Sequence, residues 1–312
     1  MMWNDDREVI EKNLNKWVPT VGKWEFKEGV AEYIAPLAKS PQPFGIALGE
    51  EGFRSGSIKT KISFDENVEG PSGQIIIGYH PATSEYYTVG LGGYGYAYVI
   101  SEFRQSRWRG LRLEGDQENL SPNTDYEIEV KLEGQRVGLR VDGIKVIEYA
   151  LPRPLTGDQI GLFAWGKSKI QFKDTKITKK RPTAFVIMKF DEPYFDELYK
   201  NVIKPVAEKM GLYAYRADEV YKPGVILKDI VRGITESEVI IAEITSLNPN
   251  VFYELGYAHC RGKDPILLAE RGTEIPFDIS GYRCIFYDNT IKGGIDFEDN
   301  LRKHLENILQ SF

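Results

Sequence analysis

Residues 129–149, EVKLEGQRVGLRVDGIKVIEY, decide the fold of the first half of the chain. Short runs in which apolar and polar residues alternate are separated by Gly134 and by the pair Asp142–Gly143, which are typical residues of tight hairpin turns. The pattern predicts two successive β-hairpins. Runs of the same texture recur from residue 23 to residue 177. Many short strands joined by regular turns predict an all-β sandwich or barrel.

Three segments of this half carry a resemblance to a known fold family. They are DYEIEVKLEGQRVGLRVDGIKVIEY (125–149), GDQIGLFAWG (157–166) and IQFKDTKI (170–177). Together they resemble the concanavalin A-like jelly-roll sandwiches, in particular the modules related to 3-keto-disaccharide hydrolases. The resemblance implies a jelly-roll domain over residues 23–178 with a glycan or a protein as its ligand.

The second half has a different texture, which begins after a short basic linker at residues 179–182. From residue 183 to residue 312, solid apolar runs such as EVIIAEI (238–244) alternate with segments of helical spacing. This alternation predicts a flavodoxin-like α/β three-layer domain with a parallel sheet covered on both faces. Within it, Pro205 is expected to kink or divide the first helix, and Gly211 to end it. A lead-in, residues 1–22, is expected to contain a short amphipathic helix over residues 5–17.

Bulk properties favour a two-domain protein of the cytoplasm. The chain has 312 residues and a net charge of −6. It lacks a long basic block, so no nucleic-acid partner is expected, and it lacks an apolar run long enough to cross a membrane. Its two cysteines, Cys260 and Cys284, stand outside any CxxC pair, which favours a reducing compartment without a disulfide or zinc framework. No metal site and no cofactor are expected.

The segment NPNVFYELG (248–256) is the strongest candidate for a site. In open α/β sheets, ligands bind at the carboxyl ends of strands, where the strand order reverses. Asn250 is expected to cap a helix that begins at Val251, which places Glu254 in the first helical turn. There the helix dipole would hold its carboxylate ionised. Acids in the first turn are also common for capping reasons alone, so a purely structural role stays open.

Four ordered blocks of this half resemble a second family: FVIMKF (185–190), YRADE (215–219), AEITSLNPNVFYELGYAHCRGK (242–263) and PFDI (276–279). They are similar to the nucleoside 2-deoxyribosyltransferase-like and Toll/interleukin receptor-like (TIR-like) enzymes. The resemblance implies that Glu254 is a catalytic glutamate that attacks the sugar carbon of a nucleotide. It also implies a substrate-binding set made of Met188, Lys189, Phe190, Asp218, Glu243, Asn248 and Asn250.

The leading functional expectation is therefore an N-glycosyl hydrolase or deoxyribosyltransferase. It would cleave the base–sugar bond of NAD or of a nucleoside phosphate, with NAD as a substrate and not as a cofactor. The sandwich would sense a signal or form a homo-oligomer, and the resemblance extends to effectors of antiviral defence.

Two other function classes stay open. The chain could be a non-catalytic module that senses a nucleotide or contacts another protein. It could instead bind or modify carbohydrate through the sandwich, where several tyrosines could stack on a sugar: Tyr86, Tyr87, Tyr94, Tyr96 and Tyr98. No acid pair in the β half stands out as catalytic, and the Gly-rich stretch 90–96 precedes no helix, so it is not a phosphate loop.

Overall fold

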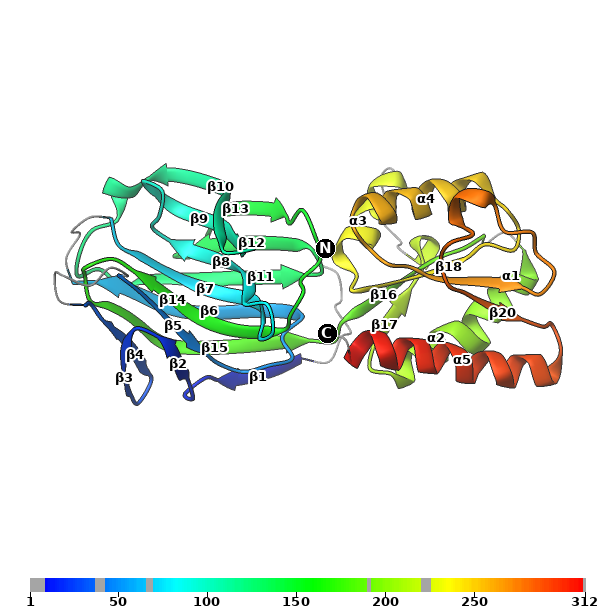
Figure 1. Ribbon diagram of the computed structural model, residues 1–312, viewed down its shortest axis with the longest axis horizontal. Helices are drawn as coiled ribbons and strands as arrows, with labels where there is room; N and C mark the ends of the chain where they lie inside the picture. Colours follow the sequence, from blue (N-terminus) through cyan, green and yellow to red (C-terminus); the bar gives the residue numbers. More distant parts are fainter. Residues whose placement is uncertain (1–8, 37–42, 66–69, 190–191, 220–225, 311–312) are drawn as a thin grey trace. The chain divides into compact units, whose positions relative to one another are not determined.

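The computed structural model describes residues 9–36, 43–65, 70–189, 192–219 and 226–310. The chain forms two compact units (Figure 1), and each is described by itself. The sandwich unit comprises Glu8–Leu151 and Leu155–Lys180. The α/β unit has Arg181–Phe312 as its main part.

Two antiparallel sheets build the sandwich unit among the described residues. Sheet A has the order β13-β12-β11-β6-β15-β4-β3, and β1 also pairs with β15. Its strands are β1 (Val9–Asn13), β3 (Lys23–Lys27), β4 (Val30–Ile34), β6 (Ser55–Phe64), β11 (Tyr126–Glu133), β12 (Arg136–Val141), β13 (Ile144–Ala150) and β15 (Ile170–Lys180).

Sheet B has the order β10-β9-β8-β7-β14-β5-β2. Its strands are β2 (Val18–Val21), β5 (Phe44–Leu48), β7 (Ser72–His80), β8 (Glu85–Leu91), β9 (Tyr96–Arg104), β10 (Arg107–Asp116) and β14 (Gln159–Trp165), and a short 3₁₀-helix, η1 (Gln117–Asn119), follows β10.

The hairpin prediction is confirmed. Strands β11, β12 and β13 pair in sequence, and the turn after β11 contains Gly134 at a φ of 53°. Asp142 and Gly143 connect β12 to β13 at φ values of 49° and 78°. Two consecutive residues with positive φ match the right-handed twist of the flanking strands, and this is why the sequence uses an Asp-Gly pair here.

Alternation along each strand separates the two faces of sheet B. The inward residues Ile75, Ile77 and Leu162 pack against sheet A in the main core. The residues between them point to the outer face, where a second, smaller cluster is buried: Ile46, Leu48, Ile76, Tyr86 and Phe163. A sheet with an apolar outer face is unusual for a surface, and it marks this face for closer inspection.

The predicted N-terminal helix is wrong. Strand β1 occupies Val9–Asn13 and pairs antiparallel with β15, from Val9 opposite Lys180 to Asn13 opposite Lys176. Ile10, an apolar residue of this segment, is 57% exposed. A short helix would have buried too little, whereas the strand fills the hydrogen-bonding edge that β15 offers. Residues 5–8 of the expected helix lie outside the described residues.

These strands also move the expected domain limits. Strands β1 and β2 belong to the sandwich sheets, so the sandwich starts before residue 23. At the other end β15 runs to Lys180, so only Arg181 and Pro182 separate it from the first strand of the α/β unit.

The α/β unit contains one parallel sheet, sheet C, with the order β17-β16-β18-β19-β20. Numbered within the unit, this is the order 2-1-3-4-5. The strands are β16 (Thr183–Ile187), β17 (Tyr213–Tyr215), β18 (Val239–Glu243), β19 (Ile266–Glu270) and β20 (Cys284–Tyr287). The prediction of a parallel sheet in this half is confirmed.

Helices cover both faces of sheet C (Figure 1). Helices α1 (Pro193–Leu198), α2 (Lys204–Lys209) and α5 (Ile291–Gln310) pack on one face, and α3 (Ile226–Glu236) and α4 (Pro249–Cys260) pack on the other. In α5 the buried residues Phe297, Leu301 and Leu305 recur every fourth position and form its inward stripe. A π-helical segment, η2 (Tyr199–Ile203), separates α1 from α2, and two 3₁₀-helices are η3 (Ala217–Glu219) and η4 (Phe277–Ile279).

Two local predictions in this unit are confirmed. Pro205 stands in the first turn of α2, directly after the π-helical segment, so the long helical pattern is divided where a proline removes a backbone donor. Gly211 follows the end of α2 at a φ of 81°, the left-handed conformation that ends helices.

Candidate functional site

A cavity of about 570 Å³ opens on the outer face of sheet B. Its size lies within the range of small-molecule sites, roughly 300–1,000 Å³. The lining comes from β7, the β8–β9 turn, β9, β10, η1 and β14. The lining residues are Gly70, Ser72, Gln74, Gly93, Tyr94, Gly95, Ser101, Trp108, Gln117, Phe163 and Trp165.

Polar side chains form the floor. Gln74 is 3% exposed, and its Nε2 donates to the carbonyl of Gly92 at 2.5 Å. Its Oε1 is buried and has no hydrogen-bond partner. Ser101 is also buried, and its hydroxyl shares a 2.8 Å hydrogen bond with Thr88 Oγ1. Buried polar atoms are nearly always paired, so the lone Oε1 calls for an explanation.

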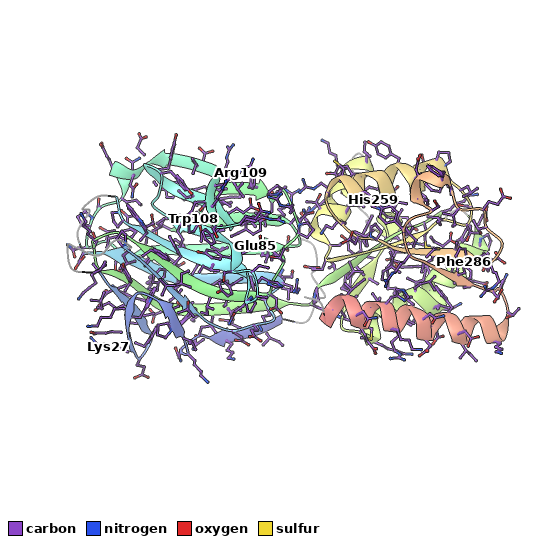
Figure 2. All side chains as sticks on the ribbon, viewed as in Figure 1. Lys27, Glu85, Trp108, Arg109, His259 and Phe286 are labelled. Carbon is purple, nitrogen blue, oxygen red and sulfur yellow. The ribbon has the colours of Figure 1, made fainter. Side chains whose placement is uncertain are left out.

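Aromatic side chains form the walls. Trp108 and Trp165 are 40% and 37% exposed, and Tyr94 is 51% exposed, although each belongs to a large apolar type. Trp108, labelled in Figure 2, packs against Phe163 with ring centroids 5.1 Å apart. Burial raises the pKa of Tyr94, and a hydrogen bond to Ser101 offsets part of that rise.

The distance between Trp108 and Phe163 shows that this face is concave. Trp108 stands on β10 and Phe163 on β14, four strand spacings apart in the sheet order. Flat strands at about 4.8 Å would separate them by roughly 19 Å. Rings 5.1 Å apart therefore require the sheet to curl, which creates the hollow.

The Gly-rich β8–β9 turn shapes the rim. Gly92 and Gly93 have φ values of 73° and 129°. A Cβ atom on Gly93 would lie 3.3 Å from Gln74 Nε2 and from Ser72 Oγ, directly on the floor. A side chain at this position would therefore reduce the cavity as well as strain the backbone.

Among the described residues, the cavity lining contains no ionisable acid or base apart from the Tyr94 phenol. Glu102 follows Ser101 on β9, so alternation turns it to the other face of the sheet. Glu85, on β8, pairs with Arg104 at 3.4 Å. The lining thus combines aromatic faces with neutral hydrogen-bonding groups.

Of the five tyrosines considered from the sequence, only Tyr94 lines the cavity. Tyr86 and Tyr87 are buried, as alternation required for part of the set. Sequence reasoning did not select the two tryptophans or Gln74. The signal was present in β7, where Gln74 is a single polar residue at the start of the apolar run QIII.

The predicted nucleotide-site residues lie at the carboxyl ends of adjacent strands of sheet C. Met188 and Lys189 follow β16, and Glu243 ends β18, where the strand order reverses. Lys189 forms an ion pair with Glu192. Phe190 lies outside the described residues. The assignment of these residues to a ligand site stays a prediction.

Glu243 and Asp218 have protein partners. Glu243 is fully buried, and burial raises the pKa of its carboxyl group. Its Oε1 accepts a hydrogen bond from Tyr287 at 2.9 Å and from the backbone of Thr245 at 3.1 Å. Asp218 receives two hydrogen bonds from Arg216, at 3.0 and 2.8 Å.

The expected helix start near Glu254 is wrong. Asn248 is the N-cap, and its side chain accepts from the backbone of Asn250; α4 therefore begins at Pro249. Glu254 is the sixth helical residue, beyond the first turn and its free amides. Burial raises the pKa of Glu254 to about 7, which is the direction opposite to the one expected from a helix dipole acting on a first-turn carboxylate.

No group of three or more His, Cys, Asp or Glu side chains is arranged to hold a metal ion in the part of the chain that the structure describes. None of the helices described is long and apolar enough to span a membrane.

No protein-family model matches the chain, and no curated protein matches it. Solved structures that resemble it include carbohydrate-binding module CBM66 from Bacillus subtilis, at 15% identity and a TM-score of 0.44 over 53% of this chain and 96% of the module. A prokaryotic β-1,3-1,4-glucanase (lichenase) derived from a mouse hindgut metagenome has 12% identity and a TM-score of 0.40, over 55% of this chain and 98% of the enzyme. The β-glucanase of Bacillus licheniformis has 11% identity and a TM-score of 0.38, over 58% and 95%.

These comparisons contradict the expectation of an N-glycosidase that acts on a nucleotide. The resembling structures are named as a carbohydrate-binding module and as glucanases. No family model and no curated protein supports a TIR-like or deoxyribosyltransferase-like half, a nucleotide or NAD as substrate, or a role in antiviral defence. About half of the chain, the sandwich unit, is an antiparallel two-sheet β-sandwich, and these solved structures are similar to it at low identity.

Proposed function

We propose that the sandwich unit binds an uncharged saccharide in the sheet B cavity and does not cleave it. The observation that carries the proposal is the lining itself: partly exposed aromatic rings stand around a polar, uncharged floor. A sugar ring has C–H faces that pack on aromatic rings and hydroxyl edges that need neutral hydrogen-bonding partners. The cavity supplies both.

The same lining argues against hydrolysis. Glycoside hydrolases in most families use two carboxyl groups, about 5–10 Å apart, on either side of the bond that is cleaved. The cavity lining has no Asp or Glu among the described residues. A ligand in this cavity would therefore be held and released unchanged.

The absence of lining charge also sets the ligand class. Burying an unpaired carboxylate or sulfate against apolar rings is costly, because the lining residues that the structure describes offer no cation to compensate. Neutral glycans are therefore expected to bind, and uronate-rich or sulfated chains are not.

The test is a binding survey with a matched pair of variants. Neutral polysaccharides (β-glucan, xylan, mannan, fructan) and charged ones (polygalacturonate, heparin) are compared by affinity electrophoresis and pull-down. Trp165→Ala should weaken binding to the positive glycan at least about tenfold, because it removes one aromatic wall. Phe26→Ala is the control, since Phe26 is similarly exposed, at 38%, but stands on sheet A.

Two results would contradict this function. If none of the glycans binds the wild-type chain, the saccharide proposal is wrong. If a glycan binds and Trp165→Ala binds it as tightly as the wild type, the cavity is not its site.

For the α/β unit we propose a flavodoxin-like three-layer fold. The support is the strand order 2-1-3-4-5 together with helices on both faces of sheet C. This proposal concerns the fold alone and assigns no substrate to the unit.

A further inference from the structure

We infer that Gln74 is the specificity-determining residue of the sheet B cavity and that its Oε1 accepts a hydrogen bond from a ligand hydroxyl. The inference rests on the proposed function and goes beyond it, because it states which ligand atom type the floor demands. Two independent observations carry it: the cavity, and a buried amide oxygen without a partner.

The orientation of the Gln74 amide follows from its donor side. Nε2 donates to the carbonyl of Gly92, which can only accept. The other amide atom must therefore be the oxygen, and this oxygen has no donor within the protein. Reversing the amide would place two acceptors against each other at 2.5 Å, so the assignment is firm.

The amide is also held in place. The carbonyl it contacts belongs to the Gly-rich turn, and Gln117, beside the same turn, donates from its backbone N–H to the carbonyl of Gly95 at 3.2 Å and from its Nε2 to the carbonyl of Pro71 at 2.9 Å. These glutamine-to-backbone bonds fix the floor and the rim before any ligand arrives. A fixed acceptor gives strong discrimination, because a ligand cannot pull it into a different geometry.

The cavity restricts which chemical group of a ligand can donate a hydrogen bond to Gln74 Oε1. An uncharged floor favours a neutral donor, and a saccharide supplies hydroxyl groups. A ligand that lacks a hydroxyl at the matching ring position would leave Oε1 buried and unpaired, whereas water can no longer reach it once the cavity is filled. Sites that demand one hydrogen bond reject analogues without it much more strongly than apolar sites reject a missing methylene.

The experiment combines one variant with one set of probes. The probes are the methyl glycosides of glucose, galactose, mannose, xylose and fructose, with their monodeoxy and deoxyfluoro forms. Fluorine keeps the approximate size of a hydroxyl group but removes its donor. Binding is measured by calorimetry and by tryptophan fluorescence, since Trp108 and Trp165 line the cavity.

Gln74→Leu removes the acceptor. Gln159→Leu is the matched control: Gln159 also donates to a backbone carbonyl, that of Gly49 at 3.2 Å, and also belongs to sheet B, but it does not line the cavity. Thermal unfolding of both variants checks that the fold is intact.

The expected result is a selective loss. Wild-type affinity should fall roughly tenfold to a hundredfold for one deoxy and one deoxyfluoro position of the bound sugar. Gln74→Leu should bind the parent sugar with a similar loss and should no longer distinguish that position. Gln159→Leu should behave as the wild type in both respects.

Failure of this inference is distinguishable from failure of the saccharide proposal. If Gln74→Leu keeps wild-type affinity and the same positional discrimination while Trp165→Ala loses binding, Gln74 is not the selecting residue although the cavity binds sugar. If no methyl glycoside and no polysaccharide binds the wild type, the saccharide proposal fails, and the inference fails with it.

Discussion

Glu254 shows how one half-buried carboxyl group can be tested by pH. Its folded pKa, about 7, lies above its ordinary value of 4.5 because burial disfavours the ionised form. Between these two values the folded chain binds more protons than the unfolded chain, so stability falls as pH rises through that window. Glu254→Gln removes this loss. The variant should match the wild type near pH 4 and exceed it near pH 8 by at most about 3 kcal/mol.

Urea unfolding at several pH values measures this difference. Glu197→Gln, on the exposed side of α1, is the control for removal of a carboxylate outside the buried region. A Glu254→Gln variant with the same advantage or deficit at pH 4 and pH 8 would contradict the raised pKa.

Sequence patterns predicted the individual side chains of the site, and their surroundings, less well than they predicted the strands and helices. Pattern and resemblance selected Glu254, but its position in the helix depends on Asn248, which caps the helix two residues earlier than expected. From the sequence alone, Gln74 is identified only as one polar residue in an apolar strand. Its importance comes from the Gly92 carbonyl, 18 positions away, and such pairs are fixed by strand register, which a single sequence does not reveal.

At the scale of elements, β10 pairs with β9 along its length, and the Trp108 side chain adds contacts to more distant strands. β10 is an edge strand, and Trp108 ties it to the concave face through contacts with Tyr86, Phe103 and Phe163 at centroid distances of 5.7, 5.1 and 5.1 Å. Trp108→Ala should destabilise the sandwich by about 1–3 kcal/mol, less than a fully buried tryptophan, because the ring is partly exposed.

The same variant should reduce saccharide affinity, since Trp108 lines the cavity. Trp108→Phe keeps an aromatic ring and should recover most of the stability. Urea unfolding provides the measurement. An unfolding free energy within about 0.5 kcal/mol of the wild type would mean that the ring cluster does not hold β10.

The sequence predicted an element correctly where its local residue pattern and its tertiary surroundings favour the same structure. The Asp142–Gly143 hairpin was predicted correctly, because the positive φ values and the strand twist leave few alternative turns. The segment 5–17 was not: its apolar spacing favours a helix, but the open edge of β15 selects a strand, and that edge is formed by residues more than 160 positions away. The curl of sheet B, which makes the cavity, has no local signature of this kind.

At the scale of the whole molecule, the sequence shows two types of hydrophobic pattern, and the change between them marks the limit between the two units. Alternating strands give way to solid apolar strands within a few residues, and the structure forms one unit from each. The residues at the boundary between the two units do not form a free linker. Lys180 still pairs in β15, and the Arg181 side chain donates to the carbonyl of Glu208 at 2.8 Å. Protease cleavage at this point is therefore a poor test of independence, since hydrogen-bonded backbone resists proteolysis.

Separate expression is the sharper test. Each unit has its own buried core, so chains comprising residues 8–180 and 181–312 should each unfold cooperatively. The cavity lies wholly within the sandwich unit, and all of its lining residues fall between Gly70 and Trp165. The 8–180 chain should therefore bind the positive glycan with the dissociation constant of the full chain, and the 181–312 chain should not bind it. A cooperatively folded 8–180 chain that loses the glycan would mean that the second unit contributes to recognition, which would end the assignment of the site to the sandwich alone.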